Sequence, residues 1–560
     1  MLKTTLLIVK SIALLLVLVA TAHAQPEIVR DAEYYILEAQ HGDNWAAQDK
    51  EIDAKLAEFR EKNGGKPPNI FYILIDDIGF GDLGSETLNA IRGYRTPSIN
   101  KIAREGMRLA RMYTEPSCTP TRVAFMTGRQ PFRNGMGNTS VDISGFGLAG
   151  KEVTLAEVLS EAGYNTSHIG KWHMGDIKEA WPTEQGFDFA AYPIHQQGQL
   201  TIFHDDAANE EVSVGIGDNN YDARFTIDGW LRTDASSMVT GVESTRGGAI
   251  REVHMKPSER WNEAKYHEMN VRYQKQAMEQ LRKLAKDDKP FFMQYWPLYP
   301  LVGARTTTKE YTTPNGGTYV EKMKLVDKWI GELMAEMEQL GVAKNTVVIV
   351  MGDNGHFTKY SPQSGYTPMI FQGGKGSTKE GGVRVDAFVR WPEMIEADSV
   401  VGDMVHVTDL FTTIARLGGA ADKIPTDRII DGIDQTALML NGETNGRRDY
   451  VFLYNINTLE AVVKEQYKLA IPGGKLDNAI LADFFDLYRD PQERYPVSTE
   501  VGAWGGAKFV RMIQRHLSRK KKYPDEGPAI GVPYEGIENL RPESQEAVKQ
   551  FLYMVKTPER

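Results

Sequence analysis

Long apolar runs that end in polar residues recur along the chain and predict buried strands. The run NIFYILIDD at residues 69–77 stays apolar until two carboxylates close it, and NTVVIVMGDNG at residues 345–355 has the same form. Strands that are apolar on both faces are typical of a parallel sheet covered by helices. Helical patterns alternate with these runs at residues 96–109, 154–162 and 320–341. The alternation predicts an α/β domain with a mainly parallel sheet between helices.

The pattern changes on both sides of this domain, which we place at residues 67–440. Residues 25–66 form an N-terminal helical arm, with a helix expected from residue 44 to residue 62 and capped by Asp43 or Asn44. Residues 196–265 lose clear periodicity, and so long an insertion is either a functional lid or a poorly ordered segment. Residues 441–560 contain short amphipathic strands, which predict a smaller C-terminal α+β domain with an antiparallel sheet.

The N-terminus has the form of an export signal. Residues 1–24 contain two lysines, an apolar run too short to span a bilayer, and an Ala-His-Ala sequence before Gln25. We therefore expect a cleaved signal peptide, no membrane anchor afterwards, and a periplasmic or secreted protein. The net charge of −10 and the single short basic run, at residues 516–524, give no indication of nucleic-acid binding.

Polar residues at two strand ends form a candidate metal site. Asp76 and Asp77 close the first apolar run, and Asp353 and Asn354 close the second. Parallel strands deliver their carboxyl ends to one edge of a sheet, so these four side chains can converge. Adjacent buried carboxylates repel one another unless a cation lies between them. An all-oxygen set favours Ca²⁺, with Mg²⁺ as the alternative, over zinc.

Three further features are ambiguous when each is considered alone. Cys118, the only cysteine in 560 residues, lies between two prolines and cannot form an intrachain disulfide. Lys171 and His173 lie two residues apart, so on an extended segment they point to one side. Lys375 lies in a Gly-rich loop that lacks the Walker pattern, because Gly376 separates the lysine from Ser377.

Together these features resemble the type I sulfatases, the formylglycine-dependent, arylsulfatase-like branch of the alkaline phosphatase superfamily. The similarity extends from about residue 69 to about residue 495. It rests on motifs that occur in the family's order: Asp76-Asp77, CTPTR at 118–122, GYNTSHIGKWH at 163–173, DNG at 353–355, GKGSTKEGG at 374–382 and DLYRDPQER at 486–494.

The resemblance implies an alkaline-phosphatase-like fold and a specific chemistry. Cys118 would be converted to formylglycine by a formylglycine-generating enzyme and would act, as the aldehyde hydrate, on a cation held by the four oxygen-bearing residues. Arg122 would hold the nucleophile, Lys171 and Lys375 would clamp the sulfate oxygens, and His173 would remove a proton from the second hydroxyl. The expected substrate is a small-molecule or glycan sulfate ester.

The chain departs from the family at the residue that protonates the leaving group. Members usually carry a Pro-His pair after a strand that starts with PFF, and in PFFMQYWPLYPLVGA at residues 290–304 Leu301 stands at the histidine position. The replacement candidates are Lys375, Tyr299, His195, His254, His267 and His356. Without the histidine, aryl sulfates should be favoured, since a phenol with a pKa of about 10 needs less protonation than an alcohol.

Two alternatives to the sulfatase interpretation remain open at the level of the sequence. A phosphodiesterase or phosphonate monoester hydrolase of the same superfamily would use similar residues. A catalytically silent protein that binds sulfated ligands is the other, because Leu301 replaces a reactive side chain.

Overall fold

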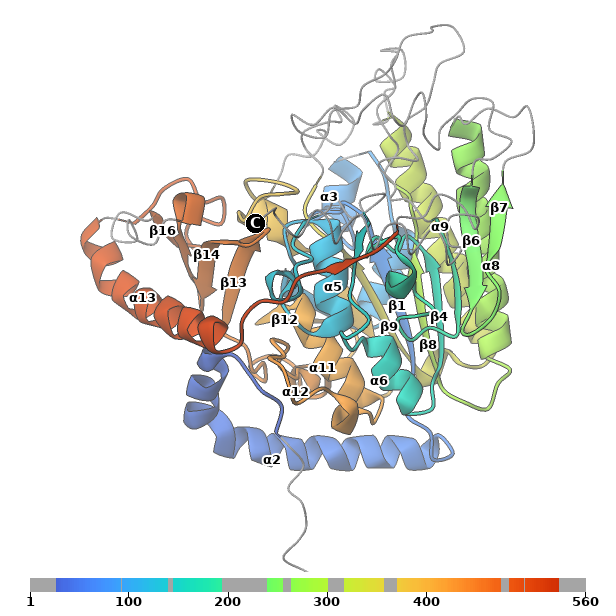
Figure 1. Ribbon diagram of the computed structural model, residues 1–560, viewed down its shortest axis with the longest axis horizontal. Helices are drawn as coiled ribbons and strands as arrows, with labels where there is room; N and C mark the ends of the chain where they lie inside the picture. The colour runs from blue at the N-terminus through green and yellow to red at the C-terminus, as the bar shows by residue number, and fades with distance from the viewer. Residues whose placement is uncertain are drawn as a thin grey trace, which may run out of the picture.

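Two sheets organise the computed structural model, which describes residues 27–91, 93–138, 145–193, 239–254, 263–300, 317–356, 370–474, 483–497 and 499–532 (Figure 1). The large sheet has the order β10-β2-β11-β9-β1-β8-β4-β5-β6-β7, with β12 paired to β2. Its strands are β1 (Asn69–Ile75), β2 (Met107–Tyr113), β4 (Asn165–Gly170), β5 (Phe189–Tyr192), β6 (Val239–Thr245), β7 (Arg251–His254), β8 (Phe291–Trp296), β9 (Thr346–Gly352), β10 (Arg384–Val385), β11 (Ala387–Arg390) and β12 (Ser399–His406).

The centre of the large sheet is parallel, as the apolar runs predict. Strands β9, β1, β8, β4 and β5 run in one direction, and Ile75 of β1 lies opposite Gly352 of β9. The register therefore brings Asp76 and Asp353, the next residue on each strand, to the same edge of the sheet. The predicted α/β fold class is confirmed.

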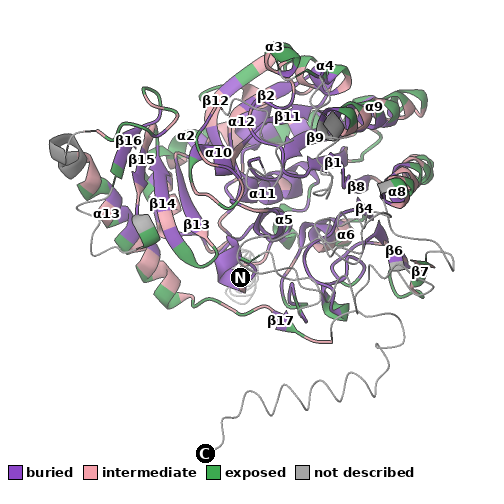
Figure 2. Cartoon of the chain, turned by 90° about the horizontal axis from the view of Figure 1, so that it is seen from above, coloured by how far each residue is buried: buried purple, intermediate pink, exposed green. Residues whose placement is uncertain are grey.

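Helices cover both faces of the large sheet, as the view from above shows (Figure 2). Alternate residues of β1 point to opposite sides: Tyr72 and Leu74 pack toward one set of helices, while Phe71 and Ile73 pack toward the other. The first set contains α5 (Cys118–Thr127), α6 (Leu155–Glu161) and α11 (Val407–Leu417), and the second contains α4 (Pro97–Arg104), α8 (Glu263–Leu284) and α9 (Gly317–Gln339).

The small sheet is antiparallel and lies beside the large domain. Its order is β13 (Tyr450–Asn455), β14 (Thr458–Lys464), β15 (Tyr467–Ala470) and β16 (Asp483–Asp486). One face packs against Tyr113 and Val383 of the large domain, and the other packs against α2 (Ala32–Lys62) and α13 (Thr499–Lys522). The described chain then returns across the large domain, where β17 (Ala529–Ile530) pairs with β3 (Phe146–Gly147) (Figure 1).

Two details differ from the sequence prediction. Helix α2 begins at Ala32, so the expected start near residue 44 was wrong; its first half buries Leu37 and Trp45 against the small sheet, a contact that no local pattern reveals. Strands β6 and β7 lie within the predicted 196–265 insertion and extend the large sheet as an antiparallel hairpin. Residues 196–238 and 255–262 of that insertion, residues 1–24 and Leu301 fall outside the described residues.

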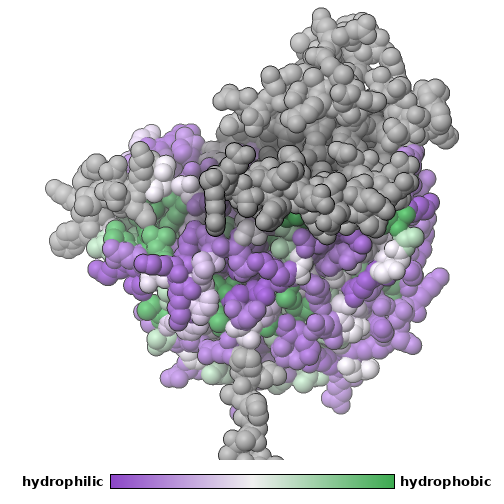
Figure 3. All heavy atoms as spheres, in the orientation of Figure 1, coloured by the Kyte–Doolittle hydropathy of each residue, from purple (hydrophilic) through white to green (hydrophobic). Residues whose placement is uncertain are grey.

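The surface has an ordinary globular character where the structure describes it. On the face shown in Figure 3, hydrophilic side chains dominate and hydrophobic ones occur in separate small patches. Scattered apolar groups of this kind are normal on protein surfaces. Within the described ranges, no helix has both the length and the apolar character that crossing a bilayer requires.

Candidate active site

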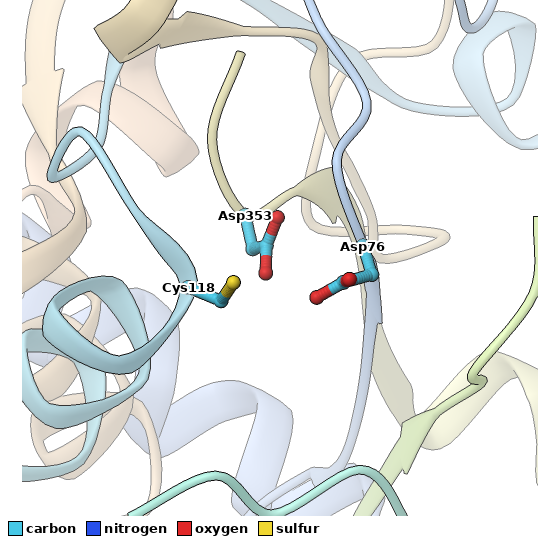
Figure 4. Close-up of side chains that lie close together, drawn as sticks. All are labelled: Asp76, Cys118 and Asp353. Carbon is cyan, nitrogen blue, oxygen red and sulfur yellow. The ribbon is translucent and has the colours of Figure 1, made fainter. Parts of the chain in front are cut away.

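The predicted site residues converge at the carboxyl edge of the large sheet. Asp76, Cys118 and Asp353 each offer a ligand atom, and these atoms lie within 4.8 Å of one another (Figure 4). All three residues are buried, and they come from the end of β1, the start of α5 and the end of β9. The structure thus brings a thiol and two carboxylates, far apart in sequence, to one point.

The second carboxylate of the pair, Asp77, contacts the same cluster. The amide nitrogen of Asn354 donates to Asp77 Oδ1 at 2.8 Å, and the ammonium of Lys375 lies 2.8 Å from the same oxygen. The backbone N–H of Asp77 donates in turn to Asp353 Oδ1 at 2.9 Å. Asp77 has a φ of 56°, a left-handed conformation that turns the chain sharply after β1.

Arg122 links α5 to the strand ends. It lies one turn after Cys118 on α5, is fully buried, and donates to Asp76 Oδ1 at 2.8 Å and Asp353 Oδ2 at 3.0 Å. Its second terminal nitrogen donates to the carbonyl of Lys171 at 3.2 Å. One guanidinium therefore fixes α5, β1, β9 and the end of β4 relative to one another.

Lys171 and His173 enter the site from the segment that follows β4. The Lys171 ammonium donates to Asp76 Oδ1 at 2.7 Å, and both side chains are buried. Burial lowers the pKa of His173 well below its ordinary value, and the charges of Lys171 and Arg122 lower it further. The imidazole is therefore neutral at ordinary pH, with one ring nitrogen unprotonated.

The pKa values of the two central carboxyls, Asp76 and Asp353, are shifted in opposite directions. Burial opposes ionisation of both, yet the charges of Lys171, Lys375 and Arg122 hold the pKa of Asp76 well below its ordinary value. For Asp353, burial and the neighbouring negative charge of Asp76 hold the pKa well above the ordinary value. Burial likewise raises the pKa of the Cys118 thiol. The site thus concentrates three cationic groups around carboxylates that repel one another.

The donor set fits a hard divalent cation. No group in the described part of the chain donates a hydrogen bond to Asp76 Oδ2 or Asn354 Oδ1, although both atoms are buried. Buried acceptor oxygens normally have a partner, so two such atoms in one cluster are what a cation site requires. Oxygen ligands of this kind suit Ca²⁺ or Mg²⁺.

The candidates for the leaving-group acid lie in different places. The ring of His267 on α8 lies 3.2 Å from the Tyr299 hydroxyl, and both pack on the α8 and α9 side of the sheet. His254 is exposed on β7 and contacts Glu252. His356 contacts Asp82 at 2.9 Å. Of the described candidates, only Lys375 is shown in contact with one of the predicted metal-site carboxylates; His195 lies outside the described residues.

Sequence reasoning missed the support behind the Lys375 loop, residues 373–379. Glu380, which follows the loop, is fully buried and contacts Lys468 from the small sheet and Tyr113 from β2. Glu380 belongs to the GKGSTKEGG motif, but a lone lysine in the middle of β15 carries no local signal of such a contact.

A buried edge of this kind, with three cations close to the first residue of a helix, suits an enzyme acting on an anionic ester. Similarity to known proteins indicates which ester this is. The family model described as Sulfatase matches residues 68–420, so the chain belongs to the sulfatase family. The protein is therefore a sulfatase, and its reaction is the hydrolysis of sulfate esters.

Curated relatives cover most of the chain. N-acetylgalactosamine-6-sulfatase of Mus musculus is 29% identical over 535 residues, covering 87% of this chain and 92% of its own length. Steryl-sulfatase of Rattus norvegicus is 30% identical, covering 78% of this chain and 86% of its own.

Solved structures confirm the fold. PsFucS1 sulfatase from Pseudoalteromonas sp. has a TM-score of 0.70 and 29% identity, covering 86% of this chain and 96% of its own. The alkaline-phosphatase-like sheet between helices and the smaller antiparallel sheet thus match the expectation from the sequence.

Proposed function

We propose that the protein cleaves sulfate monoesters with a formylglycine hydrate made from Cys118. The observation that carries this proposal is the position of Cys118 as the first residue of α5, buried within 4.8 Å of ligand atoms of Asp76 and Asp353. A thiol whose pKa is raised by burial is a poor nucleophile, which supports a role as precursor.

The chemistry explains why an aldehyde is needed. Water adds to the aldehyde to give two hydroxyls on one carbon. The oxygen of the first bonds to sulfur and gives up its proton, the bond from sulfur to the leaving oxygen breaks, and the leaving alcohol or phenol takes up a proton. The second hydroxyl then loses its proton, the aldehyde reforms, and sulfate leaves. His173, neutral because of its burial, accepts that proton.

The basic residues supply the electrostatic part of catalysis. Lys171 and Lys375 hold the sulfate oxygens on which charge develops, and Arg122 holds the nucleophile between α5 and the strand ends. Asp76, Asp77, Asp353 and Asn354 would hold Ca²⁺ or Mg²⁺, which supplies neutralisation of sulfate charge when bound. Chelation followed by readdition of either ion, with activity and unfolding temperature both measured, tests this assignment.

The leaving group decides the preferred substrate. Lys375 is the proposed proton donor, since among the described candidates it is the one shown in contact with a site carboxylate. Burial alone would lower the pKa of Lys375, but the nearby negative charges, that of Asp77 foremost, outweigh it and raise this pKa, so Lys375 is a weak acid. We expect faster turnover of nitrophenyl sulfate than of a sugar sulfate, because a phenol leaves with less help. The names of the relatives, one for a sugar sulfate and one for a steryl sulfate, support a small-molecule or glycan ester as the substrate. The sugar sulfate named for one relative is therefore the substrate to compare with nitrophenyl sulfate. Turnover of N-acetylgalactosamine 6-sulfate at least as fast as nitrophenyl sulfate would contradict the aryl preference.

The decisive test of the nucleophile is mass spectrometry of the peptide that contains Cys118. We expect the mass of an aldehyde in place of the thiol when the protein is made with a formylglycine-generating enzyme. An unmodified thiol in fully active protein would overturn the proposal.

The proposed location is the periplasm or the exterior, after cleavage of residues 1–24, and N-terminal sequencing of the exported protein checks it.

A further inference from the structure

The Lys375 loop, residues 373–379, turns at two glycines and is held in place by hydrogen bonds to other parts of the chain. Gly373 and Gly376 adopt positive φ values of 89° and 80°, so the loop turns at two residues without side chains. Its first half is held near the site: Lys375 N–H donates to the carbonyl of His356 at 2.8 Å, and Gly376 N–H donates to the carbonyl of Pro116 at 2.6 Å. Pro116 lies two residues before Cys118.

The second half of the loop is held by the small sheet. The Lys468 ammonium of β15 donates to the carbonyl of Thr378 at 2.7 Å and to Glu380 Oε1 at 3.2 Å. The Thr378 hydroxyl donates to Glu460 of β14 at 3.1 Å. Lys468 is 1% exposed, so these contacts are shielded from water and from salt.

Glu493 completes the attachment. Its Oε1 lies 2.9 Å from the Lys468 ammonium, while its Oε2 accepts the backbone N–H of Glu380 at 2.7 Å. Tyr113 donates to the other oxygen of Glu380 at 2.9 Å. Lys468 is thus the central cation of a buried cluster that joins the small sheet, the Lys375 loop and β2.

We propose that Lys468 is a positioning residue that sets where the Lys375 ammonium lies over the substrate. The inference rests on the proposed role of Lys375 in holding the sulfate. A glycine-rich loop held less firmly at its second half would sample more positions, and a displacement of about 1 Å at a catalytic group can cost about 10²-fold in rate. The small sheet therefore takes part in catalysis through one buried lysine.

The chain offers a matched control on the opposite face of the same sheet. Lys464 of β14 is also buried, with its ammonium 3.0 Å from Glu33 of α2 and 2.8 Å from Asp449. Lys464 pairs with Tyr467 across the sheet, whereas Lys468 pairs with Val463, which places the two lysines on different faces. Lys464 therefore shares burial and charge pairing with Lys468, but none of its described contacts is to the Lys375 loop.

The test compares Lys468→Met with Lys464→Met in the full chain. Activity is normalised to the formylglycine content measured by mass spectrometry, and unfolding midpoints are recorded for both. We expect Lys468→Met to lower kcat/KM by about 10- to 100-fold. Lys464→Met should change kcat/KM by less than about twofold while lowering stability to a similar extent. Equal losses of activity in the two variants, or no loss in Lys468→Met, would overturn the inference.

A double-mutant cycle separates positioning from general damage. If Lys468 acts through Lys375, adding Lys468→Met to Lys375→Ala should lower kcat/KM by less than about threefold further, since the group being positioned is already gone. Full additivity would contradict the proposal. Glu493→Gln, which removes one charge and keeps the shape, replaces Lys468→Met if the latter does not fold.

A binding measurement keeps this inference separate from the proposed nucleophile. Inorganic sulfate, the reaction product, is titrated calorimetrically into each variant. We expect Lys468→Met to weaken sulfate binding by about tenfold and Lys464→Met to leave it unchanged. Unmodified Cys118 in active wild-type protein would overturn the proposal that formylglycine is the nucleophile, but the sulfate affinities of the two variants could still be compared. Equal sulfate affinity in both variants would overturn the role of Lys468.

Discussion

The two sheets bury their charged residues in different places. The large sheet has one group of them just beyond the ends of its parallel strands, where Asp76, Lys171 and Asp353 meet at one edge. The small antiparallel sheet carries Lys464 at the end of β14 and Lys468 within β15, each on one face, where other parts of the chain cover them. Charges that meet at a common strand edge can act together on one bound group, whereas charges on a covered face hold protein segments together. Substitutions at the edge should therefore change turnover, and substitutions on the face toward α2 should change stability.

The largest effect is expected at the start of α5. Cys118→Ala removes the proposed nucleophile, and kcat should fall by at least about 10⁴-fold, the scale seen when a covalent nucleophile is lost. Stability should change by only about 1 kcal/mol, because the side chain loses a single heavy atom. Turnover of nitrophenyl sulfate and thermal unfolding measure the two quantities. Residual activity near the wild-type level would show that another group attacks sulfur.

A smaller catalytic loss is expected at Lys171. Lys171→Ala removes a buried ammonium that contacts Asp76 and, in our proposal, the sulfate, so kcat should fall by about 10²- to 10³-fold. Lys151→Ala, at an exposed lysine, is the control and should leave kcat within about twofold. A loss confined to KM would instead mean that Lys171 binds substrate and transition state equally.

The face of the small sheet toward α2 should give the opposite result. Glu33 of α2 lies 3.0 Å from the Lys464 ammonium and 2.6 Å from Arg515, and its side chain is 4% exposed. Glu33→Ala leaves these cations with one partner fewer, so the free energy of unfolding should fall by about 3 kcal/mol. Denaturant titration measures the loss, and kcat/KM should stay within about twofold. A large loss of turnover in folded protein would contradict the distinction between charges at the edge of the large sheet and charges on the face of the small sheet.

The smallest effect concerns a carboxyl, that of Asp386, whose described contacts are two backbone N–H groups and the Arg108 guanidinium. Asp386 accepts the N–H groups of Gly81 and Leu83 at 2.8 Å each, and burial raises its pKa to about 6. The folded protein then keeps this proton while the unfolded chain, with a pKa near 3.8, releases it. The stability that protonated Asp386 contributes is complete below that value and is lost as the pH rises through about 6.

Unfolding free energies across this range test the assignment. Between about pH 4 and pH 7, wild-type protein should lose about 2 kcal/mol relative to Asp386→Asn, which does not titrate. Parallel pH profiles for the two proteins would contradict the raised pKa.

The difference between the two sheets also explains what the sequence could predict. Asp76 and Asp353 follow apolar runs directly, so the topology of parallel strands was enough to place them together. Lys468 alternates with apolar residues on β15, a pattern that fits an exposed face equally well. Its burial depends on packing against β2 and the Lys375 loop, which lie more than 80 residues away along the chain. The start of α2 was missed for the same reason, because Leu37 and Trp45 are buried by a distant sheet.

The 1% exposure of Cys118 has a consequence for how active molecules arise. If formylglycine is the nucleophile, the modifying enzyme needs the CTPTR segment as an extended, accessible chain, and folding withdraws that segment into α5. Residue 118 of each molecule would then be converted to the aldehyde only if modification precedes folding; otherwise it would remain a thiol. A purified sample would then be a fixed mixture of two species, and its specific activity would report the conditions of synthesis rather than a property of the folded enzyme.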